Sequence, residues 1–237
     1  MIIITVMGGI LASFLYALTQ NNTIDFFKRR SKCDHCQIEL NVLDLIPVFG
    51  FLKNRGTCRG CHSKISSNYI ICELLVMSLF LVPVFLPIAY DDLVLYYLFV
   101  AIFIPLAIYD FETMLIPLHM VLILLLAGLF LSRFENVEIV ADTVTILILH
   151  ILYMLFKDKI GYGDIQLFSV LSLLSPLDFF IFTFLFTYIV GGLTVIILDF
   201  FTTQRITKVP LVPFIASSLI MTFYLYIDFN DIYFGGF

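Results

Sequence analysis

The chain has 237 residues, of which 61% are hydrophobic, 16% aromatic and only 13% charged, with a net charge of −5. A soluble domain usually carries about twice that share of charged residues, so the composition excludes a soluble globular protein and predicts an all-α polytopic membrane protein. The sequence has no basic domain and no RNA-binding fingerprint, which argues against a nucleic-acid partner.

Apolar stretches of about 17 residues or more are long enough to cross the ~30 Å hydrocarbon core of a bilayer as helices. Residues 165–175 are apolar but would rise only ~16 Å as a helix, so they form either a short span or a re-entrant half-helix. With that segment we expect about eight transmembrane helices. The other seven stretches are 1–19, 69–90, 93–109, 114–131, 139–156, 179–201 and 209–227. The first lacks the basic region and cleavage site of a signal peptide, so we expect it to be retained.

The basic residues fall almost entirely on one side of this arrangement. If all eight segments cross, 12 of the 13 basic residues lie on one side: eight in 20–68, two in 157–164 and two in 202–208. Only Arg133 lies on the other. The positive-inside rule then makes these loops cytoplasmic and places both termini outside. Without a crossing at 165–175, Arg205 and Lys208 would lie outside, so the charge pattern favours eight crossings.

The long polar segment 20–68 carries two Cys-x-x-Cys pairs separated by 21 residues. Two such turns can complete a tetrahedral four-sulfur site with Zn–S bonds of ~2.3 Å. Two disulfides are the alternative, but the cytoplasmic placement keeps thiols reduced and favours zinc. A closed site of this kind is structural, and it would fold a segment too polar to fold alone. The expected ligands are Cys33, Cys36, Cys58 and Cys61.

Two aspartates are the candidate catalytic residues. Asp110 begins a motif that ends in Ile116-Pro117, and Asp164 follows Gly161-Tyr-Gly163. The topology places both carboxyls at cytoplasmic ends of spans, at one membrane depth. Two carboxyls sharing one proton are the machinery of an aspartic protease. The glycines allow close backbone approach, and the proline constrains the chain after Asp110.

Other interpretations of these residues stay open. Asp164 precedes a helix and could simply cap it, Asp110 could be a loop residue, and Glu112 could supply the acid. Asp142 is expected to be a solvated span end. At the level of the whole protein, the alternatives are a polytopic transporter with a zinc-stapled loop and a non-catalytic platform for pilus or secretion assembly.

In combination these motifs resemble the bacterial type IV prepilin leader peptidases, GxGD-type membrane aspartic proteases. Asp110 with Ile116-Pro117 is similar to the first catalytic motif of that family, and Gly161-Tyr-Gly-Asp164 to the second. The paired cysteines resemble the family's zinc loop. The stretch from Tyr69 to Glu73-Leu74 resembles the opening of its second span, and Pro210-Leu-Val-Pro213-Phe214 the opening of its last.

The resemblance implies an aspartic endopeptidase of the bacterial inner membrane, with catalytic Asp110 and Asp164. Its partners would be prepilin or competence pseudopilin precursors and membrane lipid. Its metal would be zinc, in a structural role. It also implies N-methylation with S-adenosylmethionine as donor. Gln166 stands where that family usually has Lys, so peptidase activity follows more directly than methylation. The expected organisation is a first span at 1–19, a cytoplasmic zinc loop associated with methyl transfer at 20–68, and a peptidase domain at 69–237.

Overall fold

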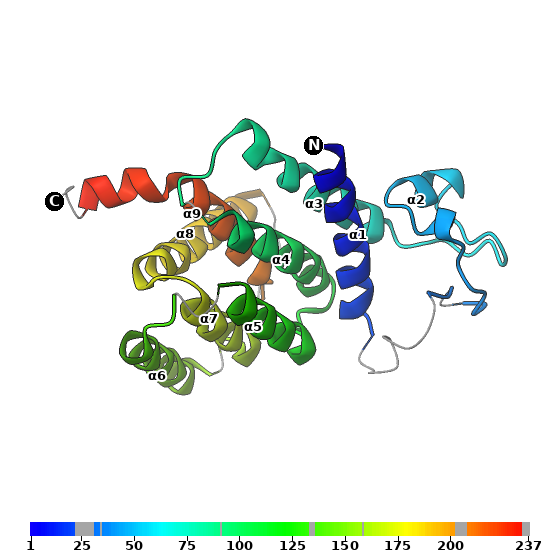
Figure 1. Ribbon diagram of the computed structural model, residues 1–237. Helices are drawn as coiled ribbons and strands as arrows, with labels where there is room; N and C mark the ends of the chain where they lie inside the picture. Colours follow the sequence, from blue (N-terminus) through cyan, green and yellow to red (C-terminus); the bar gives the residue numbers. More distant parts are fainter. Residues whose placement is uncertain are drawn as a thin grey trace. The chain divides into compact units, whose positions relative to one another are not determined.

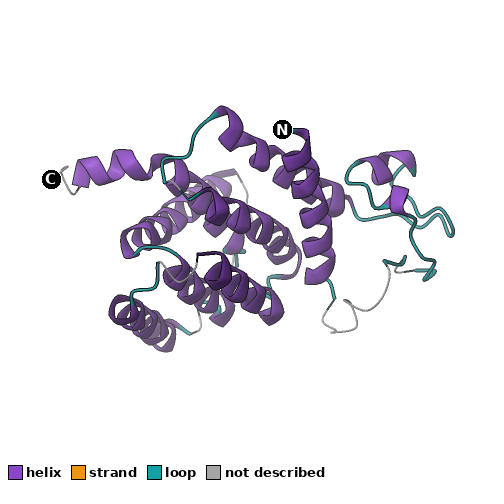
Figure 2. Ribbon diagram, viewed as in Figure 1, coloured by secondary structure: helices purple, strands orange, loops and turns teal. Residues whose placement is uncertain are grey.

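The computed structural model describes residues 1–21, 31–33, 35–90, 92–132, 136–157, 159–201 and 208–233, with side chains described up to residue 226. Within these ranges the chain is helix and loop with two isolated β-bridges (Figure 2). The all-α prediction is therefore confirmed. The chain divides into two compact units, Met1–Leu86 and Pro87–Phe237.

Several residues of the charge argument lie outside the described residues, so the structure does not test their expected side of the membrane. These residues are Lys28, Arg29, Arg30, Arg133 and Arg205.

The apolar stretches of the sequence form the long helices (Figure 1). Five of these helices are long and apolar enough to cross a membrane by length and composition, whereas α5, α7 and the described apolar part of α9 are shorter. The 13 residues of α7 rise only about 20 Å, as expected for the short segment 165–175. The helices are α1 (Ile2–Thr19), α3 (Ser67–Phe85), α4 (Leu93–Thr113), α5 (Leu118–Ser132), α6 (Ile139–Phe156), α7 (Tyr162–Leu174), α8 (Leu177–Phe201) and α9 (Val212–Tyr233).

Among the helix boundaries that differ from the expected ones, two concern the aspartates. Helix α4 continues to Thr113 and ends on Met114 in the left-handed conformation, so Asp110 lies in the last helical turn. The interpretation of Asp110 as a loop residue is wrong. Helix α7 begins at Tyr162 with Gly161 as its N-cap residue. Asp164 is therefore inside the first turn rather than the cap.

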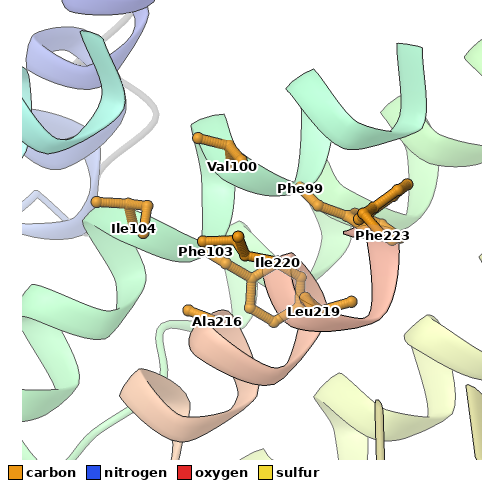
Figure 3. A pocket seen from close by; sticks show the side chains of 8 residues that line it. All are labelled: Phe99, Val100, Phe103, Ile104, Ala216, Leu219, Ile220 and Phe223. Atoms are coloured by element: carbon orange, nitrogen blue, oxygen red, sulfur yellow. The ribbon is translucent and has the colours of Figure 1, made fainter. Parts of the chain in front are cut away.

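In the second unit, α9 packs along α4. Phe223 of α9 contacts the ring of Tyr96 edge-to-face at a centroid distance of 5.2 Å, and the ring of Phe99 at 6.1 Å. One small cavity between the two helices has a volume of about 10 Å³ (Figure 3). A cavity of that size holds about one water molecule, so the α4–α9 interface is densely packed. The same unit packs α5 against α4 and α7, and α6 against α7.

In the first unit, α3 packs against α1. A Cβ atom on Gly8 would lie 2.7 Å from the Phe80 ring, so glycine there permits close approach of the two helices. Tyr16 and Tyr69 meet edge-to-face at 4.8 Å. This packing explains why the compact unit extends to Leu86, whereas the domain boundary predicted from the sequence follows residue 68.

The loop between α1 and α3 contains the short helices η2 (Val42–Asp44) and α2 (Phe49–Lys53). Asp44 joins them, because its carboxylate accepts hydrogen bonds from the Asn41 backbone N–H at 3.1 Å and the Asn54 side chain at 2.9 Å. Lys53 and Arg59 each approach it to 3.7 Å. The Asn54 hydrogen bond is the main reason why the pKa of Asp44 lies below its ordinary value.

We expect Asp44→Ala to destabilise this loop by about 1–3 kcal/mol at neutral pH, the cost of losing hydrogen bonds to a charged group. A lowered pKa in the folded state means that the ionised carboxylate stabilises the loop at neutral pH. That contribution disappears as the pH falls through the folded-state pKa. Hydrogen exchange of residues 41–65 measured against pH checks this. Equal acid sensitivity of the wild type and Asp44→Ala would contradict it, and Asp44→Asn separates the hydrogen bonds from the charge.

Candidate functional site

Asp110 is a buried carboxylate near the C-terminal end of α4, and its residue is only 4% exposed. The backbone N–H of Val212 donates a hydrogen bond of 3.0 Å to its Oδ2 atom. The backbone of Leu211 makes a second hydrogen bond to the same side chain. Both donors come from the start of α9, so residues 101 and 102 positions away in the sequence hold this carboxylate.

Asp164 lies in the first turn of α7 and is half-buried. Its carboxylate interacts with the charge of Asp110 and makes a hydrogen bond with the backbone of Gly161. The structure thus brings the two predicted catalytic residues together, although α4 and α7 are separated by two intervening helices in the sequence. The negative charges of neighbouring carboxyl groups repel each other, which disfavours ionisation of both at once.

The two motifs meet through Ile116 and Gly163. A Cβ atom on Gly163 would lie 3.0 Å from the Cβ atom of Ile116, so the Ile116 side chain rests on the glycine backbone. Pro117 follows at the entrance to α5, and its carbonyl oxygen accepts the first hydrogen bond of that helix from Met120 at 3.0 Å. Ile116 therefore places the segment after Asp110 against the turn that carries Asp164.

Polar aromatic side chains surround Asp164. Tyr188 of α8 lies close enough for its hydroxyl to interact with the charge of Asp164. In the same turn as Asp164, the ring of Tyr162 contacts Tyr153 of α6 at 5.1 Å and His150 at 6.1 Å. Neither α8 nor α6 was expected to contribute to the site, because tyrosines in apolar helices are indistinguishable in sequence from core residues.

The glycine before Asp164 gives a test of the site's geometry. A Cβ atom on Gly161 would lie 2.9 Å from the Oδ2 atom of Asp164, so Gly161→Ala must displace that carboxylate. We expect the turnover of a cleavable substrate to fall by roughly 10–100-fold, with normal membrane insertion and thermal stability. Gly192→Ala is the matched control, because nothing lies within 4 Å of its added Cβ. Equal turnover by the two variants would contradict the prediction.

The four paired cysteines form a single cluster in the first unit. Their sulfur atoms all lie within 4.8 Å of one another, and all four are free thiols, so the disulfide alternative is not realised. The Cys33 and Cys61 sulfurs are 3.8 Å apart, as are those of Cys36 and Cys58. A tetrahedron of Zn–S bonds of ~2.3 Å has edges of ~3.8 Å, so the cluster fits a metal ion of that size.

The two cysteine turns have the same backbone pattern. In each, the first cysteine donates its N–H to the residue five positions ahead, at 3.0 Å from Cys33 and 2.9 Å from Cys58. The residue directly after the second cysteine has positive φ in both turns, 59° at Gln37 and 56° at His62. An isolated bridge closes each turn. His62 thus has a backbone position equivalent to that of Gln37, and the metal cluster consists of cysteines alone.

The thiols of the cluster are unequal. Backbone groups of Cys36 and His35 lower the pKa of Cys33 to about 6, and hydrogen bonding from Ser63 lowers the pKa of Cys61. The backbone of Ile38 favours the Cys36 thiolate, yet desolvation and neighbouring sulfurs raise its pKa to about 11. Four thiolates repel one another at this distance, and a bound cation would remove that repulsion.

Glu73, predicted to support the site, belongs to the first unit. Its buried carboxylate accepts a hydrogen bond of 2.7 Å from the backbone N–H of Val48. Val48 has a positive φ of 63°, which is costly for a β-branched residue. Glu73 therefore holds the strained turn after Leu45-Ile46-Pro47 against α3.

Two family models match the chain. Residues 6–86 match the bacterial peptidase A24 N-terminal domain, and residues 95–197 match the type IV leader peptidase family. These matches correspond to the two compact units. No solved structure matches the chain.

Curated relatives agree with the family models. A prepilin leader peptidase/N-methyltransferase from Bacillus subtilis is 28% identical over 95% of this chain and 94% of its own length. One from Vibrio cholerae is 29% identical over 84% of this chain and 83% of its own length. One from Pectobacterium carotovorum is 33% identical over 60% of this chain, and this match spans only 54% of that relative.

Proposed function

Because the chain belongs to the prepilin leader peptidase family, we propose that it is a membrane aspartic endopeptidase that removes leader peptides from type IV prepilin-like precursors. The observation that carries this proposal is the pairing of Asp110 with Asp164 across α4 and α7. The cleavage would take place at the cytoplasmic face of a bacterial inner membrane, where the positive-inside pattern puts both residues.

In the proposed reaction the two carboxyls bind one water molecule between them. The ionised carboxylate takes a proton from this water as its oxygen attacks the scissile carbonyl carbon. The protonated carboxyl donates its proton to the developing oxyanion, and the tetrahedral intermediate then breaks its C–N bond to release the leader. Asp164 is half-buried and Asp110 is almost completely buried, so we expect the peptide to approach from the side of Asp164.

An apolar groove between α6 and the start of α8 would suit a substrate with a hydrophobic helix. It has a volume of about 860 Å³. Phe184 lines it and contacts Tyr188 at 4.9 Å, which in turn interacts with Asp164. A prepilin helix in this groove would lead its leader junction toward the two aspartates.

We propose zinc as the metal of the cysteine cluster, held by Cys33, Cys36, Cys58 and Cys61. The sulfur spacing supports it, and four sulfur ligands favour zinc among common cellular metals. The metal would fold the loop and leave no open position for chemistry.

Methyl transfer, the second activity in the relatives' names, extends the proposal. The family match over residues 6–86 supports it. S-adenosylmethionine would supply the methyl group to the new N-terminus.

Mass spectrometry of a prepilin-like precursor, incubated with and without the purified protein in vesicles, tests both activities. The expected product is a precursor shortened by its leader, with an added methyl group if S-adenosylmethionine is used. An intact precursor would overturn the peptidase proposal. If solute flux into the vesicles accompanied it, the transporter alternative would replace it.

A further inference from the structure

The start of α9 contains two prolines around two ordinary residues, Pro210-Leu211-Val212-Pro213. Proline has no backbone N–H, so Leu211 and Val212 are the only donors in this stretch. Both donate to the carboxylate of Asp110, Val212 at 3.0 Å.

These two residues form the N-terminus of α9. The carbonyl oxygen of Leu211 accepts hydrogen bonds from Phe214 at 3.0 Å and Ile215 at 3.1 Å, which makes Leu211 the N-cap residue and Val212 the first helical residue. The unpaired N–H groups at a helix N-terminus carry a partial positive charge. Asp110 thus receives donors that no intrahelical acceptor competes for.

The hydrogen bonds from α9 matter because the rest of the surroundings of Asp110 disfavours a negative charge on its carboxyl group. It lies in the last turn of α4, where the helix dipole opposes a negative charge, and its side chain is almost completely buried. A buried carboxylate stays ionised only if hydrogen bonds replace its hydration. The packing of α9 along α4, with Phe223 against Tyr96 and Phe99, keeps the donors in place.

Asp164 has a weaker set of donors. Asp164 lies in the first turn of α7, and Asp110 faces the N-terminus of α9. Each carboxyl therefore lies at a helix N-terminus, so dipoles alone do not explain a difference between the two. The backbone of Gly161 is its hydrogen-bonding partner, against two backbone groups at Asp110. When two carboxyls share one negative charge, the charge resides where more donors point.

We propose that the N-terminus of α9 fixes Asp110 as the ionised carboxylate that activates water, which leaves Asp164 as the proton donor. Leu211 and Val212 are then positioning residues that act through their backbone N–H groups. This assignment rests on the proposed peptidase function.

Other titratable groups on the helices packed around Asp110 do not account for the asymmetry. On α4, Glu112 is exposed. On α5, His119 lies in the first turn, beyond Pro117. The part of α9 whose side chains the structure describes, residues 212–226, carries no charged side chain. Asp164 of α7 is the group whose charge acts together with that of Asp110.

Val212→Pro tests the assignment, because it removes the N–H at the one helical position where proline fits best. We expect the acid limb of the pH profile of cleavage to move up by about one to two pH units, since hydrogen bonds to a charged group contribute about 1.5–3 kcal/mol. Val212→Ala keeps the N–H but loses side-chain packing. The difference between the two variants therefore reports the N–H alone, and identical acid limbs would overturn the proposal.

A second measurement does not depend on cleavage. In an Asp164→Asn background, isotope-edited infrared spectroscopy follows protonation of Asp110 directly. Asp110 should protonate at higher pH with Val212→Pro than with Val212→Ala, and equal titration would refute the role of α9. If Val212→Pro fails to insert, Leu211→Pro compared with Leu211→Ala gives the same test. Failure of the wild type to cut any prepilin would refute the proposed function and leave the infrared result intact.

Discussion

Asp110→Asn and Asp164→Asn are each expected to reduce leader cleavage by ~10²–10⁴-fold, the contribution of a positioned acid or base. Asparagine keeps the size of the side chain but can neither accept a proton from water nor donate one as an acid. Quantitative mass spectrometry of the cleaved precursor measures this loss. Because the two carboxyls act as a unit, the double variant should be about as slow as either single variant rather than the product of the two.

The matched control for this pair is Glu112→Gln. Glu112 is exposed and two residues from Asp110 in the same helical turn, so its substitution makes the same chemical change in the same region. It should retain cleavage, which would also dismiss Glu112 as the acid. Normal insertion of each variant is checked by its thermal unfolding. Full cleavage by Asp110→Asn or Asp164→Asn would remove the mechanism.

Loss of one cysteine ligand is expected to have the largest effect on the first unit. Structural zinc contributes ~10–16 kcal/mol to small metal-folded domains, so removal of one of four ligands should weaken binding by ~100-fold or more. Cys58→Ser is the best choice, because Cys58 is the most buried ligand at 4% exposure. Elemental analysis measures the bound metal. Hydrogen exchange should rise across residues 31–65, and a chelator should reproduce this in the wild type.

Cys72→Ala provides the control for the cysteine experiment. Cys72 is fully buried in α3, and its sulfur lies 3.9 Å from the carbonyl oxygen of Ala12, apart from the metal cluster. Metal content should be unchanged by this substitution. Full metal content in Cys58→Ser would show that the four sulfurs do not act as a metal site.

The sequence predicted the features that depend on pattern alone. The apolar stretches became helices, and the segment at 165–175 was recognised as unusually short, because length and hydropathy are local properties. The Cys-x-x-Cys spacing predicted the sulfur cluster for the same reason. For Asp142 the prediction was wrong. It was expected to be a solvated residue at the end of a span, but it is only 4% exposed, and its carboxylate accepts a hydrogen bond of 2.9 Å from the backbone N–H of Glu138.

The donors to Asp110 could not be predicted from the sequence. Backbone N–H groups occur at nearly every residue, and only tertiary packing of α9 against α4 selects those of Leu211 and Val212. The one available signal was the pair of prolines at 210 and 213, which resembled a family element without indicating its partner. The tyrosines around Asp164 were missed because aromatic residues make up 16% of the chain.

The contact between Ile116 and Gly163 has a consequence for how such a site tolerates mutation. Two carboxyl groups that repel each other supply no attraction that would bring them together. Contacts between uncharged atoms must hold them together. Here the Ile116 side chain, packed on the backbone of Gly163, provides one of these contacts. Substitutions that change only the volume of apolar residues beside the site can therefore abolish cleavage, even though both aspartates are still present.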